Sequence, residues 1–119
     1  MKKKKTNHRT GLAAEALCRL ALRLKGYSIV AARYRSPLGE IDIIARRGHS
    51  IALVEVKARP TRSEAAEAIG PQQRARLARG AADFLARHPH FNRHQLRFDV
   101  MLVTPWRWPE HIADAWRPE

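Results

Sequence analysis

The sequence has little cysteine and no long hydrophobic run. Its single cysteine, Cys18, cannot close an intramolecular disulfide or supply a zinc site built on several cysteines. The fold must therefore be stabilised by packing, which suits a reducing cytoplasm. No apolar run approaches the roughly 18 residues that a membrane span needs. Residues 2–5 resemble the start of a signal peptide, but Arg19, Arg23 and Lys25 interrupt the apolar stretches that follow. We therefore expect a cytoplasmic protein without a membrane segment.

Acidic residues are also scarce. The 119 residues include 11 Asp and Glu against 23 Lys and Arg, which gives a formal net charge of +12. This balance indicates a polyanionic partner, nucleic acid first of all, although an arginine-rich composition alone would also produce it. A chain of this length fits one domain and is too short for a TIM barrel. We expect that domain at residues 10–119, behind a basic, disordered tail at residues 1–9 that could follow a phosphate backbone.

Apolar spacing and turn residues predict alternating helices and strands. A first helix is expected from Thr10, as its N-cap, to Gly26. Pro71 is expected to begin a second helix that runs to about Arg87. The tail after Pro105 is expected to pack back as a short helix or strand. Strands are predicted at residues 27–35, 40–46, 50–58 and 96–104, and loops at residues 59–69 and 88–94.

Acidic residues recur with strand periodicity in two neighbouring segments. The first is Gly39-Glu40-Ile41-Asp42, and the second, after twelve intervening residues, is Glu55-Val56-Lys57. Side chains alternate between the two faces of a strand, so both acids of the first segment should share one face. Ile41 and Ile43 should share the opposite face. The glutamate and the lysine of the second segment should likewise lie together on one face of the next strand.

The turn between these strands sets their register. A two-residue turn at residues 48–49 places Asp42 directly opposite Glu55, and Glu40 opposite Lys57. A turn longer by two residues keeps the same pairing. Directly opposed residues on one face have Cβ atoms roughly 5 Å apart. The sequence therefore predicts that the two carboxylates lie side by side.

Opposed carboxylates repel each other unless a proton, Lys57 or a divalent metal cancels the repulsion. Carboxylate oxygens suit Mg²⁺ or Mn²⁺ better than Zn²⁺. A metal held by Asp42 and Glu55 beside a lysine is suited to phosphodiester cleavage. Lys57 could orient the attacking water, act on its proton or stabilise the charge of the phosphorane. The alternative is a half-buried sheet face that Lys57 and nearby arginines neutralise.

These motifs resemble those of a known nuclease superfamily. GEIDIIA at residues 39–45 and VEVKAR at residues 54–59 are similar to the PD-(D/E)xK pattern, with Asp42 as its first acid and Glu55 and Lys57 as its ExK. The chain resembles in particular the YraN-type family of small predicted endonucleases, whose core is similar to that of archaeal Holliday-junction resolvases. The similarity extends over nearly the whole chain and includes residues 11–15, 24–27 and 97–100.

The resemblance implies a fold and roles for individual residues. The fold is α/β, a restriction-endonuclease-like three-layer α-β-α core of order α-β-β-β-α-β with a short C-terminal element. Asp42 and Glu55 would bind Mg²⁺ or Mn²⁺, and Lys57 would be the catalytic lysine. Glu15 matches a first-helix glutamate that joins the site in the resolvase-like branch. Its other interpretation is a surface pair with Arg19, one helical turn later.

Other positions near the motifs are expected to support the site or depart from the family. Glu40 is expected beside the site, as a partner of Lys57. Many relatives carry a lysine near the start of the second helix, where this chain has Gln72 and Gln73. The amide of Gln73 can still hydrogen-bond a water or a phosphate, but it brings no charge. Arg33 stands where relatives usually have asparagine.

Together these features predict an Mg²⁺-dependent endonuclease that hydrolyses DNA phosphodiester bonds, on branched or structured DNA. The alternatives are a non-catalytic nucleic-acid-binding module on a nuclease fold and an RNA- or ribosome-associated basic protein. DNA is favoured over RNA as the partner, and a homodimer is expected because resolvase-like relatives pair to cut two strands. Basic residues on the tail and on helix faces would bind phosphates without reading sequence. These residues are Lys2, Lys3, Lys4, Lys5, Arg19, Arg23, Arg59, Arg74, Arg76 and Arg79.

Four further groups receive structural interpretations. The six histidines show no metal-ligand spacing. Cys18 is expected to be a buried small apolar residue rather than a nucleophile. Asp99 interrupts an apolar strand and is expected to form a salt bridge outside the site. The three tryptophans near the C-terminal end could stack on bases, but such residues more often close a small core or a dimer contact. They are Trp106, Trp108 and Trp116.

Overall fold

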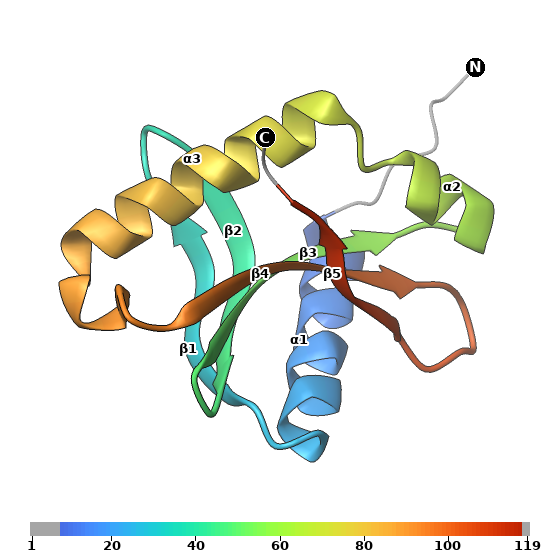
Figure 1. Cartoon of the computed structure of the whole chain (residues 1–119). Coiled ribbons are helices and arrows are strands. Elements are labelled where there is room, and N and C mark those ends of the chain that lie inside the picture. Colours follow the sequence, from blue (N-terminus) through green and yellow to red (C-terminus); the bar gives the residue numbers. More distant parts are fainter. Residues whose placement is uncertain (1–7, 118–119) are drawn as a thin grey trace.

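Helices flank a five-stranded sheet in the computed structural model, which describes residues 8–117 (Figure 1). Within this range no helix has the length and apolar character needed to cross a membrane. The predicted succession α-β-β-β-α-β is confirmed, and the C-terminal element is a strand. The elements are α1 (His8–Leu24), β1 (Ser28–Arg35), β2 (Glu40–Arg47), β3 (Ser50–Ala58), α2 (Arg62–Glu67), α3 (Pro71–Arg87), the 3-10 helix η1 (Pro89–Phe91), β4 (Gln95–Val103) and β5 (Glu110–Trp116).

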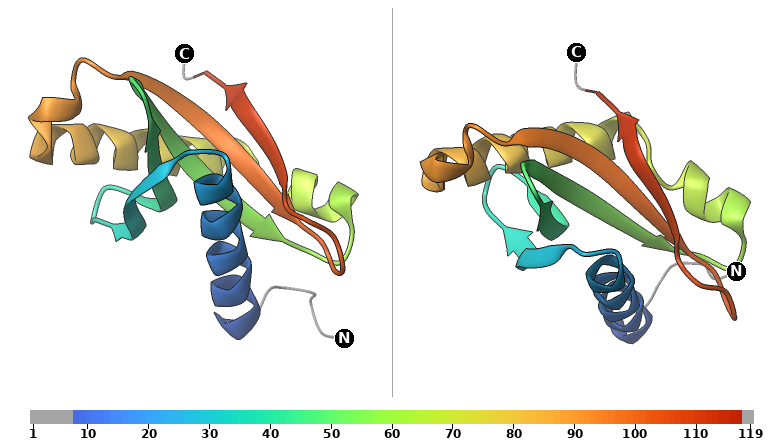
Figure 2. Two further views of the ribbon diagram at one scale, coloured as in Figure 1. Left: turned by 90° about the horizontal axis from the view of Figure 1, so that it is seen from below. Right: turned by 60° about the horizontal axis from the view of Figure 1, so that its bottom comes forward.

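The strands lie in the order β1-β2-β3-β4-β5. β3 pairs with β4 in parallel, and the other neighbouring strands pair antiparallel. Parallel neighbours need a crossover connection, and here α2 and α3 form it. Figure 2 shows α1 on one face of the sheet and α3 on the other. This arrangement is the three-layer α-β-α core that the family resemblance implies.

Apolar side chains cover both faces of the sheet. β3 is buried continuously from Ile51 to Val56, which explains why its sequence is largely an apolar run rather than an alternating pattern. Cys18 is fully buried as predicted, and this burial raises the pKa of its thiol to about 12. The layer under α1 includes Ala14, Leu22, Ile43, Val54 and Met101, and the layer under α3 includes Ile41, Ile44, Leu53, Leu77, Phe84 and Phe98.

Two expectations about the helices are wrong. α1 begins at His8, so Thr10 lies inside the helix and is not its N-cap. The segment predicted to be a loop at residues 59–69 contains the short helix α2. The side chain of Thr61 accepts a hydrogen bond from the backbone N–H of Glu64, and Ala65 is buried against β4. The sequence does hold a signal for this helix, because Thr-Arg-Ser-Glu fits the capping-box pattern.

β2 departs from regular alternation at its N-terminal end. Ile41 packs in the layer under α3, whereas Ile43 packs in the layer under α1, so the two do not share a face as predicted. The break falls at Asp42, whose carboxylate, not its backbone, accepts the N–H of Val56. The facing residue of β1, Arg33, has a left-handed φ of 58°. These two local distortions turn the end of β2 away from the regular pleat.

A polar cluster lies on the α1 face, away from the acids of β2 and β3. Asp99 is fully buried and accepts hydrogen bonds from Arg97, from His111 and from the backbone N–H of Asp114. Arg97 also donates to the hydroxyl of Tyr27. The predicted salt bridge of Asp99 is therefore confirmed. The cluster joins β4 to β5 and to the residue that precedes β1.

Candidate functional site

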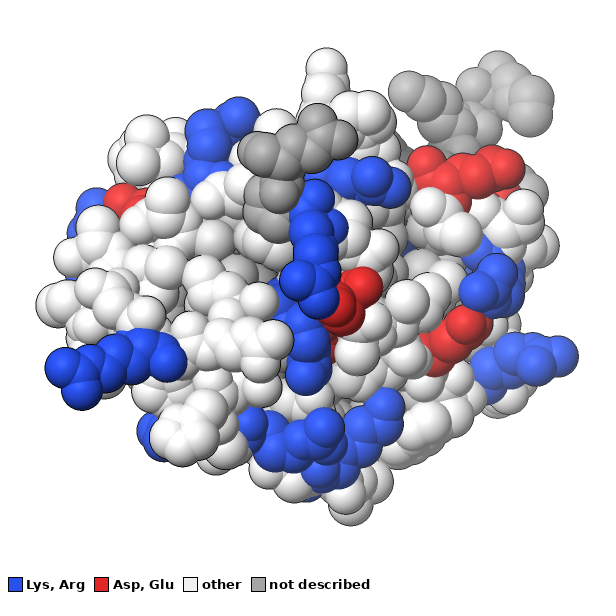
Figure 3. Space-filling model, in the orientation of Figure 1, with Lys and Arg blue, Asp and Glu red and all other residues white. Residues whose placement is uncertain are grey.

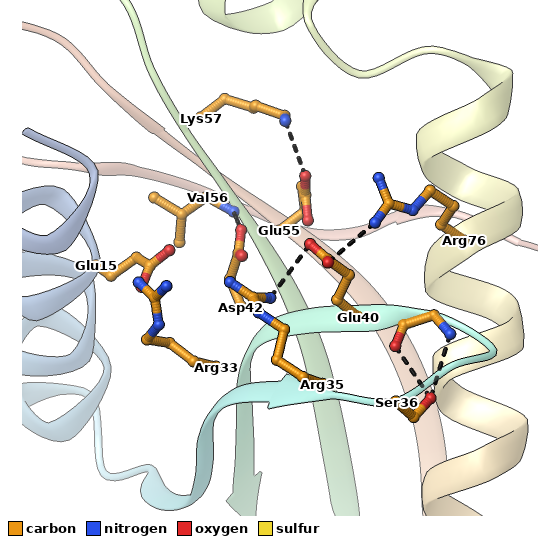
Figure 4. A network of polar contacts seen from close by, with 11 residues as sticks. Glu15, Arg33, Arg35, Ser36, Glu40, Asp42, Glu55, Val56, Lys57 and Arg76 are labelled. Carbon is orange, nitrogen blue, oxygen red and sulfur yellow. Dashed lines mark hydrogen bonds and ion pairs between the residues drawn. The ribbon is translucent and has the colours of Figure 1, made fainter. Parts of the chain in front are cut away.

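A polar pocket of about 270 Å³, called the acidic pocket below, lies between the first half of α1, the first turns of α3, the start of β2 and the end of β3. The four residues predicted to be catalytic all line it: Glu15, Asp42, Glu55 and Lys57. Gln73 of α3 lines it as well. In Figure 4, Asp42 lies between Glu15, which comes from α1, and Glu55 on β3. Folding thus brings residues from four elements to one place.

Asp42 is fixed by the backbone of β3. The predicted register is confirmed from Arg47 opposite Ser50 to Ile43 opposite Val54. Beyond that pair, Asp42 Oδ2 accepts the N–H of Val56 at 2.8 Å. The carboxylate therefore satisfies a backbone donor that has left the regular ladder, and its position does not depend on solvent.

Glu55 and Lys57 form a nearly buried ion pair. Lys57 Nζ lies 3.0 Å from Glu55 Oε2, and the side chains are 14% and 7% exposed. Burial raises the pKa of Glu55, the neighbouring carboxylate of Asp42 raises it further, and Lys57 lowers it. The balance is a pKa of about 7. Asp42 and Glu55 therefore hold more negative charge than the pocket stabilises by itself.

Glu15 is buried and faces the same pocket. Arg33 Nη1 donates to Glu15 Oε1 at 3.3 Å, so the carboxylate pairs with β1 and not with Arg19. Burial raises the pKa of Glu15, and the negative charge of Asp42 adds to this, while Arg33 opposes both. Arg33 of β1 thus places a positive charge beside the Glu15 carboxylate.

Glu40 has other partners than the one predicted. Its carboxylate lies 3.3 Å from Arg35 Nη1 and 3.0 Å from Arg76 Nη2, and not in an ion pair with Lys57. Because Ile41 faces α3, the end of β2 turns toward that helix and carries Glu40 to Arg76. Glu40 lines the rim of the pocket between β1 and α3.

Gly39 allows β2 to start in direct contact with α3. A Cβ at this position would lie 2.2 Å from the carbonyl oxygen of Arg76 and 2.7 Å from the backbone nitrogen of Gly80. The hydroxyl of Ser36 accepts the backbone N–H groups of Leu38 and Gly39 and so closes the preceding turn. The sequence pattern identifies Gly39 only as part of the Gly39-Glu40-Ile41-Asp42 segment. Because glycine has no side chain, the backbone at Gly39 can contact the backbone of α3 directly, and this contact positions α3 beside the pocket.

The predicted phosphate-binding residues fall into three groups: the N-terminal lysines, two arginines at the acidic pocket, and arginines on the outer faces of the helices. Lys2, Lys3, Lys4 and Lys5 lie outside the described residues, as does most of the predicted tail; only His8 and Arg9 of that tail are described, at the start of α1. Arg59 and Arg76 line the acidic pocket. A phosphate that entered the pocket would therefore meet positive charge at its rim.

The remaining basic residues lie on the outer faces of the helices. Arg79 is exposed on α3 and donates to the carbonyl of Leu38, and the guanidinium of Arg74 lies 5.6 Å from the ring centre of Trp116. Arg19 is half-buried and Arg23 exposed on α1. Figure 3 shows Lys and Arg spread over one face, with the acidic residues in small separate groups.

Comparison with known proteins identifies the family. Residues 14–103 match the family described as "Uncharacterised protein family UPF0102". The chain belongs to UPF0102. A UPF0102 protein of Parvibaculum lavamentivorans is 58% identical over 111 residues, which cover 93% of this chain and 84% of that relative. Another UPF0102 protein, from Paramagnetospirillum magneticum, is 51% identical over 92% of this chain and 88% of its own length. The YraN-type resemblance is thereby confirmed.

A solved structure has the same fold. It is that of Hjc, a Holliday junction resolvase of the archaeal hyperthermophile Archaeoglobus fulgidus, which superposes with a TM-score of 0.52. The match covers 92% of this chain and 83% of the resolvase at 19% identity. The predicted nuclease-like fold class of this UPF0102 protein is confirmed by this likeness and by the strand order of the sheet.

Proposed function

We propose that this UPF0102 protein is a metal-dependent nuclease that hydrolyses DNA phosphodiester bonds, on branched or structured DNA. The observation that supports it most is the meeting of Asp42, Glu55 and Lys57 in one pocket with arginines at its rim. A purely structural sheet face would not need a nearly buried carboxylate whose pKa is raised to about 7. The likeness in fold to a resolvase agrees with this function.

The donor set of the pocket fits a hard divalent cation. Across residues 8–117 no three His, Cys, Asp or Glu side chains are gathered closely enough to hold a metal ion by themselves. Asp42 and Glu55 offer two carboxylates, and Mg²⁺ is commonly bound through one or two carboxylates together with waters and substrate phosphates. A divalent cation held there would polarise a phosphoryl oxygen and lower the pKa of a water molecule. Its charge would also relieve the repulsion that raises the pKa of Glu55.

The chain's own residues supply the remaining chemistry. Lys57 is held by Glu55 at 3.0 Å and can donate from its ammonium group to a water or to a phosphate oxygen in the pocket. A developing negative charge on the phosphoryl group is stabilised by this ammonium. Gln73 can orient a water or a phosphate through its amide, and Arg76 and Arg59 can hold the flanking phosphates at the rim. A homodimer would place two such pockets on two strands.

A cleavage panel tests the proposal. Linear, nicked, flapped and four-way DNA are incubated with the full chain in Mg²⁺ or Mn²⁺, beside the variant Glu55→Ala. The matched control is Glu67→Ala, which removes an exposed glutamate of α2 outside the pocket. We expect cleavage by the wild type and by the control, and loss of cleavage with retained DNA binding in Glu55→Ala.

Two outcomes would favour the other functions. Salt-sensitive DNA binding without cleavage in either metal would indicate a non-catalytic binding module. Tighter binding to structured RNA than to any of the DNA forms at the same salt concentration would indicate an RNA-associated protein. Equal cleavage by Glu55→Ala and the wild type would refute the assignment of the site.

A further inference from the structure

Two tryptophans are exposed on the loop between β4 and β5, outside the acidic pocket. Trp106 is 102% exposed and Trp108 is 55% exposed. The third tryptophan is different, because Trp116 stacks on Phe98 with ring centres 5.2 Å apart. An indole contributes to folding stability by burial, so two exposed indoles separated by a single residue indicate a surface that binds a partner.

The loop is held in shape. Pro105 and Pro109 stand on either side of the Trp106-Arg107-Trp108 triplet, and each fixes its own φ angle. The N–H of Arg107 donates to the carbonyl of Thr104 at 3.4 Å. Trp106 has a left-handed φ of 62°, which is unfavourable for an aromatic residue and persists only where the surrounding structure imposes it. The indoles are therefore presented by an ordered turn.

A pocket of about 690 Å³ lies under this loop. Its lining includes Arg107 and Trp108 of this loop and Arg62 of α2. Glu110 also lines the pocket, but both of its oxygens are bound by Arg62, at 2.6 and 2.9 Å. Arg107 is exposed, and within the part of the chain that the structure describes it has no ion pair. The charge that the pocket leaves for a partner is therefore positive.

This loop pocket and the acidic pocket lie at the same end of the sheet. β3 and β4 run parallel, and their last paired residues are Ala58 and Val103. Arg59 lines the acidic pocket, and the next residues, Pro60 and Thr61, line the loop pocket. Figure 2 shows the β4–β5 loop beside α2 at this end. A strand of nucleic acid that left one pocket could enter the other across residues 59–61.

We propose that the Trp106-Arg107-Trp108 loop binds unpaired nucleotides. Bases would stack on the indoles of Trp106 and Trp108, and Arg107 would contact the phosphate between them. A flat aromatic surface beside a cation matches the base and the phosphate of a nucleotide. A fully paired duplex offers no accessible base face along its length, because each base is stacked between its neighbours. This inference rests on the proposed nuclease function and names its substrate class, DNA with single-stranded segments such as flaps or open junctions.

Binding measured without divalent metal tests the loop independently of cleavage. Fluorescence anisotropy in EDTA is recorded for a single-stranded, a flapped and a blunt duplex DNA at one salt concentration. The variants are Trp106→Ala, Trp106→Ala with Trp108→Ala, and, as the matched control, Trp116→Phe, which changes a tryptophan stacked in the core. Because Trp106 is fully exposed, its replacement leaves the fold intact. Quenching of indole fluorescence by the single strand is followed in parallel.

We expect the double variant to bind the single-stranded and flapped DNA about tenfold more weakly, and blunt duplex within about twofold of the wild type. Trp106→Ala should give part of this loss, and Trp116→Phe none. Equal weakening on all three DNA forms, or no weakening, would overturn the proposal. So would a dimer that the double variant converts to a monomer in sedimentation, because a second copy would then cover the loop. Failure of the nuclease function is seen separately, as absence of cleavage by the wild type in Mg²⁺ or Mn²⁺.

Discussion

Replacement of Glu55 by glutamine should make the protein more stable at neutral and alkaline pH. Glu55 is nearly buried beside Asp42, and its pKa rises from an ordinary 4.5 to about 7 through burial and this neighbour. Between these two pH values the folded protein keeps a proton that the unfolded chain has released. The free energy of unfolding therefore falls as pH rises through this window. At about 1.4 kcal/mol per pKa unit, the difference amounts to about 3 kcal/mol above pH 7.

The assay is urea unfolding in EDTA at several pH values from 4.5 to 8, for the wild type, Glu55→Gln and the control Glu67→Gln. The variant keeps the size of the side chain but holds no charge. Its stability relative to the wild type should increase by up to about 3 kcal/mol from pH 4.5 to pH 8. Glu67→Gln, on the exposed face of α2, should follow the wild type. A difference between Glu55→Gln and the wild type that does not change with pH would refute a strained, buried carboxylate.

Three further predictions follow from particular contacts. Gly39→Ala should destabilise the protein by about 1–3 kcal/mol in urea unfolding, because its Cβ would meet the backbone of α3 at Gly80; an unchanged midpoint would show that α3 moves freely. Asp99→Asn should destabilise it at pH 7. Burial would raise the pKa of Asp99, but its hydrogen bonds outweigh this and lower the pKa to about 2, so the loss should shrink by about 2 kcal/mol as pH falls from 4 to 2. Arg33→Gly removes a side chain from a residue with left-handed backbone conformation and also removes the partner of Glu15. Calorimetric titration should show that this variant binds Mn²⁺ about two- to fivefold more tightly than the wild type. Weaker binding would mean that Arg33 helps to assemble the site.

Local patterns predicted the elements and the register well. The turn at residues 48–49 determined the pairing of β2 with β3, and this pairing is confirmed up to Ile43 opposite Val54. Pro71 marked the start of α3, and the segment predicted as a strand at residues 50–58 is β3. Such features depend on residues that are close in sequence, so the sequence alone determines them. The capping box at Thr61 was also local, and it would have revealed α2.

Contacts between distant segments could not be predicted in the same way. The change of face at Asp42 depends on the N–H of Val56, which folding brings to it across the sheet. Glu15 pairs with Arg33 and not with its helical neighbour Arg19, because β1 packs beside α1. Helical spacing identifies only possible partners within the same helix, such as Arg19. The acidic residues predicted to form the site, Glu15, Asp42 and Glu55, do line one pocket, but their interaction partners are determined by tertiary packing.

The cleavage rate of Lys57→Ala tests the central claim most directly. The wild type, Lys57→Ala and an exposed control, Arg93→Ala, are held at saturating concentration on the DNA form that the panel shows to be cut best, in Mg²⁺ or Mn²⁺. If Lys57 acts in the pocket as proposed, its replacement should slow cleavage by about a hundredfold or more. DNA binding and the cleavage rate of the control should stay unchanged. A Lys57→Ala protein that cleaves at the wild-type rate would contradict the account.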